Sequence, residues 1–221
     1  MIKLCIFDLD GTVLDTVRSI AYFANAALEK NGVAPIPEGE YKYLAGRGMA
    51  NLARGMLDYH NCYSPTLYEA VVRDYNAAYN ADVTFLTTIF DGLKETLDAL
   101  KARGVRMAIV SNKPDFAAQS VVRALYGDGY FDFVTGQTPG GALKPDPGAV
   151  LDVVERFGVG REECLYVGDT DTDMQTGKNA GLYTVGVLWG FRDRQELEQT
   201  GADRVIERPA QLLELVLTPT I

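Results

Sequence analysis

Aspartates gather at two points of this 221-residue sequence, and the first is the pair Asp8 and Asp10, followed by Gly11 and Thr12. Side chains two residues apart in an extended segment point the same way, so both carboxylates can face one site. Two like charges held that close are costly unless a cation or a bound proton compensates them. The pair therefore indicates metal binding or acid–base chemistry, with an acidic turn closed by an Asx hydrogen bond as the alternative.

The second point is residues 168–173, which read Gly-Asp-Thr-Asp-Thr-Asp after an apolar run. Carboxylate oxygens are hard ligands that suit Mg²⁺, which usually takes one or two of them and keeps several waters. The later glycine and glutamate of an EF-hand loop are missing, so that calcium pattern does not fit. An acidic cluster that caps a helix is the alternative interpretation.

Two further loops offer groups for an anion. Ser111 and Asn112 follow an apolar run and precede Pro114, where a helix could begin and favour an anion at its N-terminus. A plain helix cap explains the same residues. Lys144 precedes Pro145 in a stretch that proline stiffens, so it could act as a point charge for a phosphate. An exposed surface lysine is the alternative.

The elements that must position these loops alternate between strands and helices. Apolar runs predict strands at 3–10, 105–110, 131–135, 165–167 and 183–188. Helical stripes predict helices at 93–104, 114–126 and 145–157 and another that ends near Ala180. This alternation predicts an α/β fold with a Rossmann-like, doubly wound parallel sheet. Ligands of such sheets bind beyond the carboxyl ends of the strands, so the four loops can converge.

Residues 16–84 have a different pattern, with helical spacing and no convincing strand. Within this stretch we expect a helix that ends at Gly32, one that begins at Pro37, and two more at 51–58 and 65–80. The sequence thus predicts an α/β core of residues 1–15 and 85–221 with a small all-helical domain inserted after the first strand.

Composition narrows the function classes. The net charge of −9 argues against nucleic acid or an anionic membrane as a main partner. No apolar run approaches a membrane span, and the early aspartates interrupt what a signal peptide would need. Three scattered cysteines suggest neither a disulfide framework nor a metal pair, so we expect a reducing cytoplasmic location. His60 is the only histidine, which argues against a catalytic triad built on histidine.

Taken together, the four loops resemble the motifs of the haloacid dehalogenase superfamily of aspartate-nucleophile phosphotransferases. The resemblance covers nearly the whole chain, because the helical insertion matches the small cap domain of that family. It implies that Asp8 attacks a phosphoryl group and forms an aspartyl-phosphate, while Asp10 acts as general acid and then general base. It implies Mg²⁺ as the cofactor, with these metal ligands: the Asp8 carboxylate, the Asp10 main-chain carbonyl, Asp169, and Asp173 directly or through water.

The same resemblance implies phosphate-binding roles for Ser111, Asn112 and Lys144. Thr12 joins them by bracing the first loop, and Asp171 has a supporting role at most. Movement of the cap is expected at hinges near 14–16 and 81–89.

The loop Gly46-Arg47-Gly48 is similar to the cap loop of phosphoglycolate phosphatases. Its glycines allow a tight loop over the site, and Arg47 could bind a substrate carboxylate through two hydrogen bonds. A surface arginine is an equal alternative. We therefore expect an Mg²⁺-dependent phosphatase of a small-molecule phosphate ester, with phosphoglycolate favoured, as a monomer or homodimer. A β-phosphoglucomutase-like mutase, a pyrophosphatase and a non-catalytic binding protein on the same fold stay open.

Overall fold

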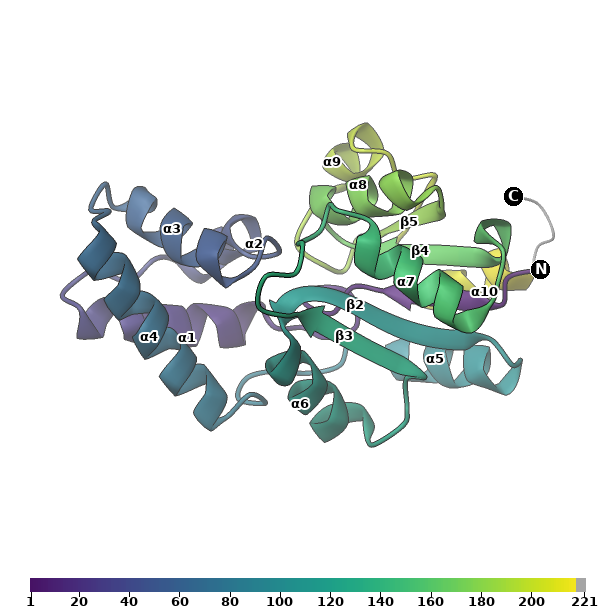
Figure 1. Ribbon diagram of the computed structural model, residues 1–221, viewed down its shortest axis with the longest axis horizontal. Helices are drawn as coiled ribbons and strands as arrows, with labels where there is room; N and C mark the ends of the chain where they lie inside the picture. The colour runs from purple at the N-terminus through teal and green to yellow at the C-terminus, as the bar shows by residue number, and fades with distance from the viewer. Residues whose placement is uncertain (218–221) are drawn as a thin grey trace.

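A six-stranded sheet in which every pair of neighbouring strands is parallel forms the centre of the computed structural model, which describes residues 1–217 (Figure 1). The strand order is β3-β2-β1-β4-β5-β6. The strands are β1 (Leu4–Phe7), β2 (Arg106–Pro114), β3 (Phe133–Gln137), β4 (Cys164–Gly168), β5 (Tyr183–Val187) and β6 (Arg204–Ile206). The order reverses direction between β1 and β4, and this is the place where such sheets bind ligands. The α/β, Rossmann-like prediction is confirmed.

Helices cover both faces of the sheet because successive strand residues point to opposite sides. Cys5 and Phe7 of β1 pack in one apolar cluster with α5 (Leu93–Ala102), α6 (Asp115–Tyr126) and α10 (Gln211–Leu217). Leu4 and Ile6 pack in a second cluster, with α7 (Gly148–Phe157) and the end of α8 (Asp171–Ala180). Burial on both faces explains why the first strand reads as a continuous apolar run.

Residues 17–81 form the helical part expected after the first strand, at one end of the molecule in Figure 1. Its elements are α1 (Val17–Lys30), the 3₁₀ helix η1 (Glu38–Glu40), α2 (Tyr41–Leu44), α3 (Met49–Tyr59) and α4 (Pro65–Ala81). They share an apolar cluster of their own, which Phe191 and Ala117 of the sheet-bearing part also join. Ser64 caps α4 by accepting a hydrogen bond from the Leu67 amide at 3.3 Å, and Pro65 occupies the first turn.

The two chain segments expected as hinges lie side by side. Asp15 and Thr88 form an isolated antiparallel bridge, with the Asp15 amide 2.8 Å from the Thr88 carbonyl and the Thr88 amide 3.2 Å from the Asp15 carbonyl. Leu86, inside the second segment, has a φ of 56°, a left-handed conformation that is unusual for leucine. The helical part is therefore joined to the sheet through one narrow, hydrogen-bonded double connection.

Several boundaries differ from the sequence prediction. β2 continues to Pro114, four residues past Val110, with an irregular register against β3. α7 begins at Gly148 rather than Pro145, and the expected helix at Pro37 is only η1 and the short α2. Three elements were not predicted: α9 (Arg194–Gln199), β6 and α10. The 3₁₀ helix η2 (Arg161–Glu163) precedes β4. Residues 218–221 of the expected core lie outside the described residues.

Within residues 1–217, no helix has both the length and the apolar character that crossing a membrane requires.

Candidate active site

Three of the predicted aspartates meet at the carboxyl ends of the two central strands. Asp8 follows β1 and Asp169 follows β4, and β1 pairs with β4 so that Phe7 lies opposite Val167. Asp173, in the first turn of α8, completes the group. Each residue offers a carboxylate oxygen that lies within 4.8 Å of the other two, and all three are buried.

The Lys144 ammonium lies between two of these carboxylates. Its Nζ is 2.7 Å from Asp8 Oδ1 and 2.7 Å from Asp173 Oδ1, and both ion pairs are buried. Burial alone would favour the neutral amine, but Asp173 and Asp8 outweigh it and hold the pKa of Lys144 well above its ordinary value. Lysine is therefore charged here, as an anion-binding role requires.

The carboxylates are oriented by further hydrogen bonds. Asp169 accepts from the Thr12 hydroxyl at 2.6 Å and from the Phe191 amide at 2.8 Å. Asp173 Oδ2 accepts from the Thr170 amide at 3.0 Å and the Thr170 hydroxyl at 2.6 Å, in a capping box at the start of α8. Thr12 thus orients the Asp169 carboxylate, because its hydroxyl donates a hydrogen bond to it.

Negative charge exceeds positive charge in this cluster, which fits a divalent cation. Burial and the Asp173 carboxylate raise the pKa of Asp8 to about 7, while Lys144 opposes the shift. Burial, with Asp173 and Asp8, also raises the pKa of Asp169 well above its ordinary value. Asp8 Oδ1 is buried and accepts no hydrogen bond from the described residues, although Lys144 pairs with it as a charge. Three buried carboxylates with oxygens this close together offer the hard donors that a divalent cation takes.

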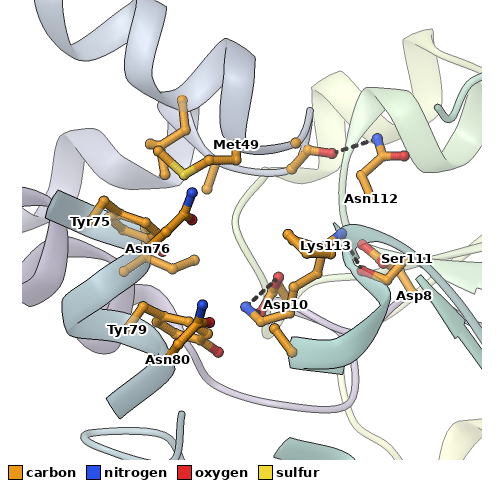
Figure 2. A pocket seen from close by; sticks show the side chains of 17 residues that line it. Asp8, Asp10, Met49, Tyr75, Asn76, Tyr79, Asn80, Ser111, Asn112 and Lys113 are labelled. Atoms are coloured by element: carbon orange, nitrogen blue, oxygen red, sulfur yellow. Dashed lines mark hydrogen bonds and ion pairs between the residues drawn. The ribbon is translucent and has the colours of Figure 1, made fainter. Parts of the chain in front are cut away.

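A pocket opens in front of Asp8 and Asp10, between the sheet and the helical part (Figure 2). Ser111 lines the same pocket, and its hydroxyl accepts a hydrogen bond from the Lys113 amide at 3.2 Å. The pocket is lined by Asp8, Asp10, Ile20, Ala45, Gly46, Gly48, Met49, Leu52, Tyr75, Asn76, Tyr79, Asn80, Ser111, Asn112, Lys113, Pro114 and Ala117.

Lys113 is a charged lining residue to which the sequence analysis gave no role. Its Nζ lies 3.0 and 3.1 Å from the two carboxylate oxygens of Asp10, and 4.7 Å from the centre of the Tyr79 ring. Burial opposes its charge, but Asp10 and the tyrosine hydroxyls hold the pKa of Lys113 above its ordinary value. The available signal was its place directly after Ser111 and Asn112, at the end of a central strand.

The Asn112 side chain binds backbone groups from two other loops. Its Nδ2 donates to the Gly46 carbonyl at 3.1 Å and the Lys144 carbonyl at 3.3 Å, and its Oδ1 accepts from the Lys144 amide at 2.8 Å. The amide therefore joins the loop of Lys144 to the glycine loop of the helical part. The Asn112 side chain is thus engaged with protein groups, and the Lys113 amide beside it is bonded to the Ser111 hydroxyl.

The glycine loop between α2 and α3 lies on the sheet-bearing part. Gly46 and Gly48 have φ values of 100° and 83°, and a Cβ on Gly48 would come 3.5 Å from the Asn112 carbonyl. Arg47 points away from the pocket lining, because its Nη2 pairs with Asp171 Oδ2 at 2.6 Å. Arg192 makes a second link, through a hydrogen bond from its Nη1 to the Lys42 carbonyl.

Comparisons with known proteins agree with this fold. The family model described as haloacid dehalogenase-like hydrolase matches residues 5–187. The phosphoglycolate phosphatase of Aquifex aeolicus is 32% identical over 97% of this chain and 96% of its own. A crystal structure from Lactobacillus delbrueckii subsp. bulgaricus, provisionally assigned as a phosphoglycolate phosphatase, matches with a TM-score of 0.91 at 30% identity, over 97% of this chain and 98% of that one.

A β-phosphoglucomutase from Clostridium difficile shares the fold, with a TM-score of 0.78 over 96% of this chain and 93% of that one, at 22% identity. That level of identity supports the architecture alone. The match of the family model over most of the chain, together with the Aquifex relative, decides the family. The chain therefore belongs to the haloacid dehalogenase-like hydrolases, as an enzyme of the phosphatase type found among them.

Proposed function

We propose that this enzyme is an Mg²⁺-dependent hydrolase of small phosphomonoesters, with phosphoglycolate as the favoured substrate, and that it works through an aspartyl-phosphate on Asp8. The main support is that Asp8 and Asp10 line one pocket, while Lys144, which is not among the lining residues, forms an ion pair with the Asp8 carboxylate. The names of the Aquifex and Lactobacillus proteins favour phosphoglycolate. A mutase has only the shared fold in its favour.

In the first half of the proposed reaction, an Asp8 carboxylate oxygen bonds to phosphorus while the bond from phosphorus to the ester oxygen breaks. Asp10 gives its proton to the departing alcohol oxygen. In the second half, water attacks phosphorus, Asp10 takes the proton from that water, and the bond between phosphorus and Asp8 breaks. Inorganic phosphate and the free Asp8 carboxylate result.

The Asp8 and Asp169 carboxylates, the Asp10 main-chain carbonyl and Asp173, directly or through water, would hold Mg²⁺. When bound, the cation offsets the negative charge of the nucleophile and of the transferring phosphoryl group. The Asp173 carboxylate already receives Lys144 and Thr170, so its oxygens are oriented before a metal arrives.

Lys144, Ser111 and Asn112 would hold the phosphoryl oxygens, Asn112 through its backbone because its side chain binds the neighbouring loops. Lys144 offers a buried positive charge next to the nucleophile, and the Ser111 hydroxyl lines the pocket. Thr12 acts indirectly through Asp169, and Asp171 acts on the cap loop through Arg47. We also propose that residues 16–84 form a mobile cap. The proposed location is a reducing cytoplasm.

A panel of phosphate esters with and without Mg²⁺ tests the proposal. It should contain 2-phosphoglycolate, pyrophosphate and a hexose 1-phosphate, with inorganic phosphate and isomerised sugar phosphate measured separately. Phosphate release that needs Mg²⁺ and is fastest with 2-phosphoglycolate supports the proposal. An isomerised hexose phosphate would identify a mutase, and the absence of turnover on every ester would indicate a binding protein.

A further inference from the structure

The charges that line the pocket are uneven. Asp8 and Asp10 are the acidic lining residues, and Lys113 is the one cation among the lining residues that the structure describes. Lys144, which is not among the lining residues, forms ion pairs with Asp8 and Asp173. A substrate with a second negative group, beyond its phosphate, therefore has Lys113 as its available positive partner in this pocket.

Arg47 does not compete for that role. It lies outside the pocket lining, and its guanidinium pairs with Asp171 on α8. Arg192 is likewise engaged, with Glu196 at 2.9 Å and with the Lys42 carbonyl. With both arginines engaged, the recognition of a substrate anion falls to groups inside the pocket.

Two amides from α4 face the same side of the pocket. Asn76 and Asn80 lie four residues apart, on one face of the helix, and Figure 2 shows the Asn80 amide extending toward Lys113 with the Asn76 amide beside Met49, on the same side of the pocket. Neither side-chain amide has a hydrogen-bond partner among residues 1–217. The remaining cap wall there combines the apolar Met49 and Leu52 with Tyr75 and Tyr79. Such convergent polar groups beside apolar and aromatic side chains are typical of sites that orient a small ligand.

The position of Lys113 also suits the geometry of the reaction. Its Nζ lies 3.0 Å from Asp10, which under the proposed function must reach the leaving oxygen. Lys113 therefore lies beside that oxygen. In 2-phosphoglycolate the carboxylate is attached to the carbon that bears the leaving oxygen, so it falls on the same side. An ammonium has three donors, and Asp10 faces only one side of it.

We infer that Lys113, together with the Asn76 and Asn80 amides, forms a second anion subsite that binds a carboxylate on the leaving group of the substrate. This inference rests on the proposed phosphatase function. It makes these three residues the determinants of selectivity for small acidic phosphate esters, in place of Arg47.

The test compares 2-phosphoglycolate with 2-hydroxyethyl phosphate, which replaces the carboxylate by a neutral hydroxymethyl group of similar size. The readout is the ratio of kcat/KM for the two esters. A charge-assisted hydrogen bond corresponds to a ratio of about 10 to 100 in the wild-type enzyme. Lys113→Met should bring the ratio close to one. The double change Asn76→Leu and Asn80→Leu, which does not touch Asp10, should lower it about 3- to 10-fold.

Lys94→Met is the matched control, because Lys94 also pairs with an aspartate (Asp98, 2.9 Å) and lies near a tyrosine ring (Tyr130, 5.2 Å), but on α5 outside the pocket. It should leave the ratio unchanged. Should Lys113→Met fail to fold, as circular dichroism would reveal, the asparagine variant decides the question.

The outcomes separate this inference from the function beneath it. No hydrolysis of either ester by the wild-type enzyme would overturn the proposed function. Hydrolysis of both at equal efficiency would leave the function intact and overturn the subsite. Loss of activity in Lys113→Met by the same factor on both esters, with an unchanged ratio in the asparagine variant, would also overturn it, because Lys113 would then serve Asp10 alone.

Discussion

The ion pair between Arg47 and Asp171 links the cap loop to the first turn of α8, and its removal has a calculable consequence. Arg47→Gln keeps a polar side chain of similar length but removes the charge. The glycines on either side keep their positive φ values, so the loop itself should hold its shape. The variant therefore weakens the contact between the glycine loop and α8 without altering the pocket lining.

The magnitude follows from distance and exposure. The two atoms lie 2.6 Å apart, and the Arg47 side chain is 58% exposed while that of Asp171 is 15% exposed. In water a pair at 2.6 Å gains about 1.6 kcal/mol of Coulomb energy. Fixing the arginine side chain and screening by salt reduce the net gain to about 0.5–1 kcal/mol. We expect KM for every phosphate ester to rise about 2- to 5-fold, with kcat nearly unchanged.

The assay measures KM and kcat with 2-phosphoglycolate and 2-hydroxyethyl phosphate for Arg47→Gln, Asp171→Asn and the double variant. Either single change should match the double, because both remove one interaction. Arg54→Gln is the control, since its partner Asp58 lies within the same helix at 2.7 Å. A loss of about 10- to 100-fold confined to 2-phosphoglycolate in Arg47→Gln, with Asp171→Asn unaffected, would show that Arg47 binds the substrate carboxylate and refute this reasoning.

Four further predictions follow from the buried carboxylates and the packing. Asp8→Asn should abolish phosphate release while the far-ultraviolet circular dichroism stays native, whereas Asp91→Asn, at an exposed position, should keep full activity; substantial turnover by Asp8→Asn excludes Asp8 as the nucleophile. Thr12→Val removes the 2.6 Å hydrogen bond to Asp169 and should weaken Mg²⁺ activation about 10- to 100-fold in a metal titration. The folded-state pKa of Asp8 is raised from 3.8 to about 7, so the folded chain binds more protons than the unfolded chain between these pH values. The stability of the metal-free protein should therefore fall as pH rises through this range. Mg²⁺ should raise Tm more at pH 8 than at pH 5, and an equal shift at both would contradict this. Leu28→Ala, at a fully buried position in α1, should lower the free energy of unfolding by about 2–5 kcal/mol in urea titrations.

Much of the fold could be read from local patterns. The strand of Leu4–Phe7 is apolar on both faces because helices cover both sides of the sheet, and this signal needs only a few residues. The helix after Pro114 and the helix that ends at Ala180 follow from equally local rules. By contrast, α9, β6 and α10 were not predicted, because β6 has only three residues and the two helices have six and seven.

The candidate site divides in the same way. Residues that follow central strands, such as Asp8 and Asp169, were found because strand order places strand ends at one edge of the sheet. Lys113 has no role in the sequence prediction because nothing local shows that its ammonium pairs with Asp10, 103 residues away. For Arg47 the sequence leaves a substrate contact and a surface position equally open, because nothing local shows that its partner is Asp171.

The sequence by itself determined the family, the parallel sheet and the set of carboxylates at its centre, since each of these depends on residue types at short and regular spacing. Only the tertiary structure decided which charges neutralise one another. Lys113 and Asp10 are 103 residues apart, and Arg47 and Asp171 are 124 apart. The first pair depends on β1 and β2 lying side by side, and the second depends on how the helical part lies on the sheet-bearing part. A partner more than 100 residues away leaves no local pattern in the chain.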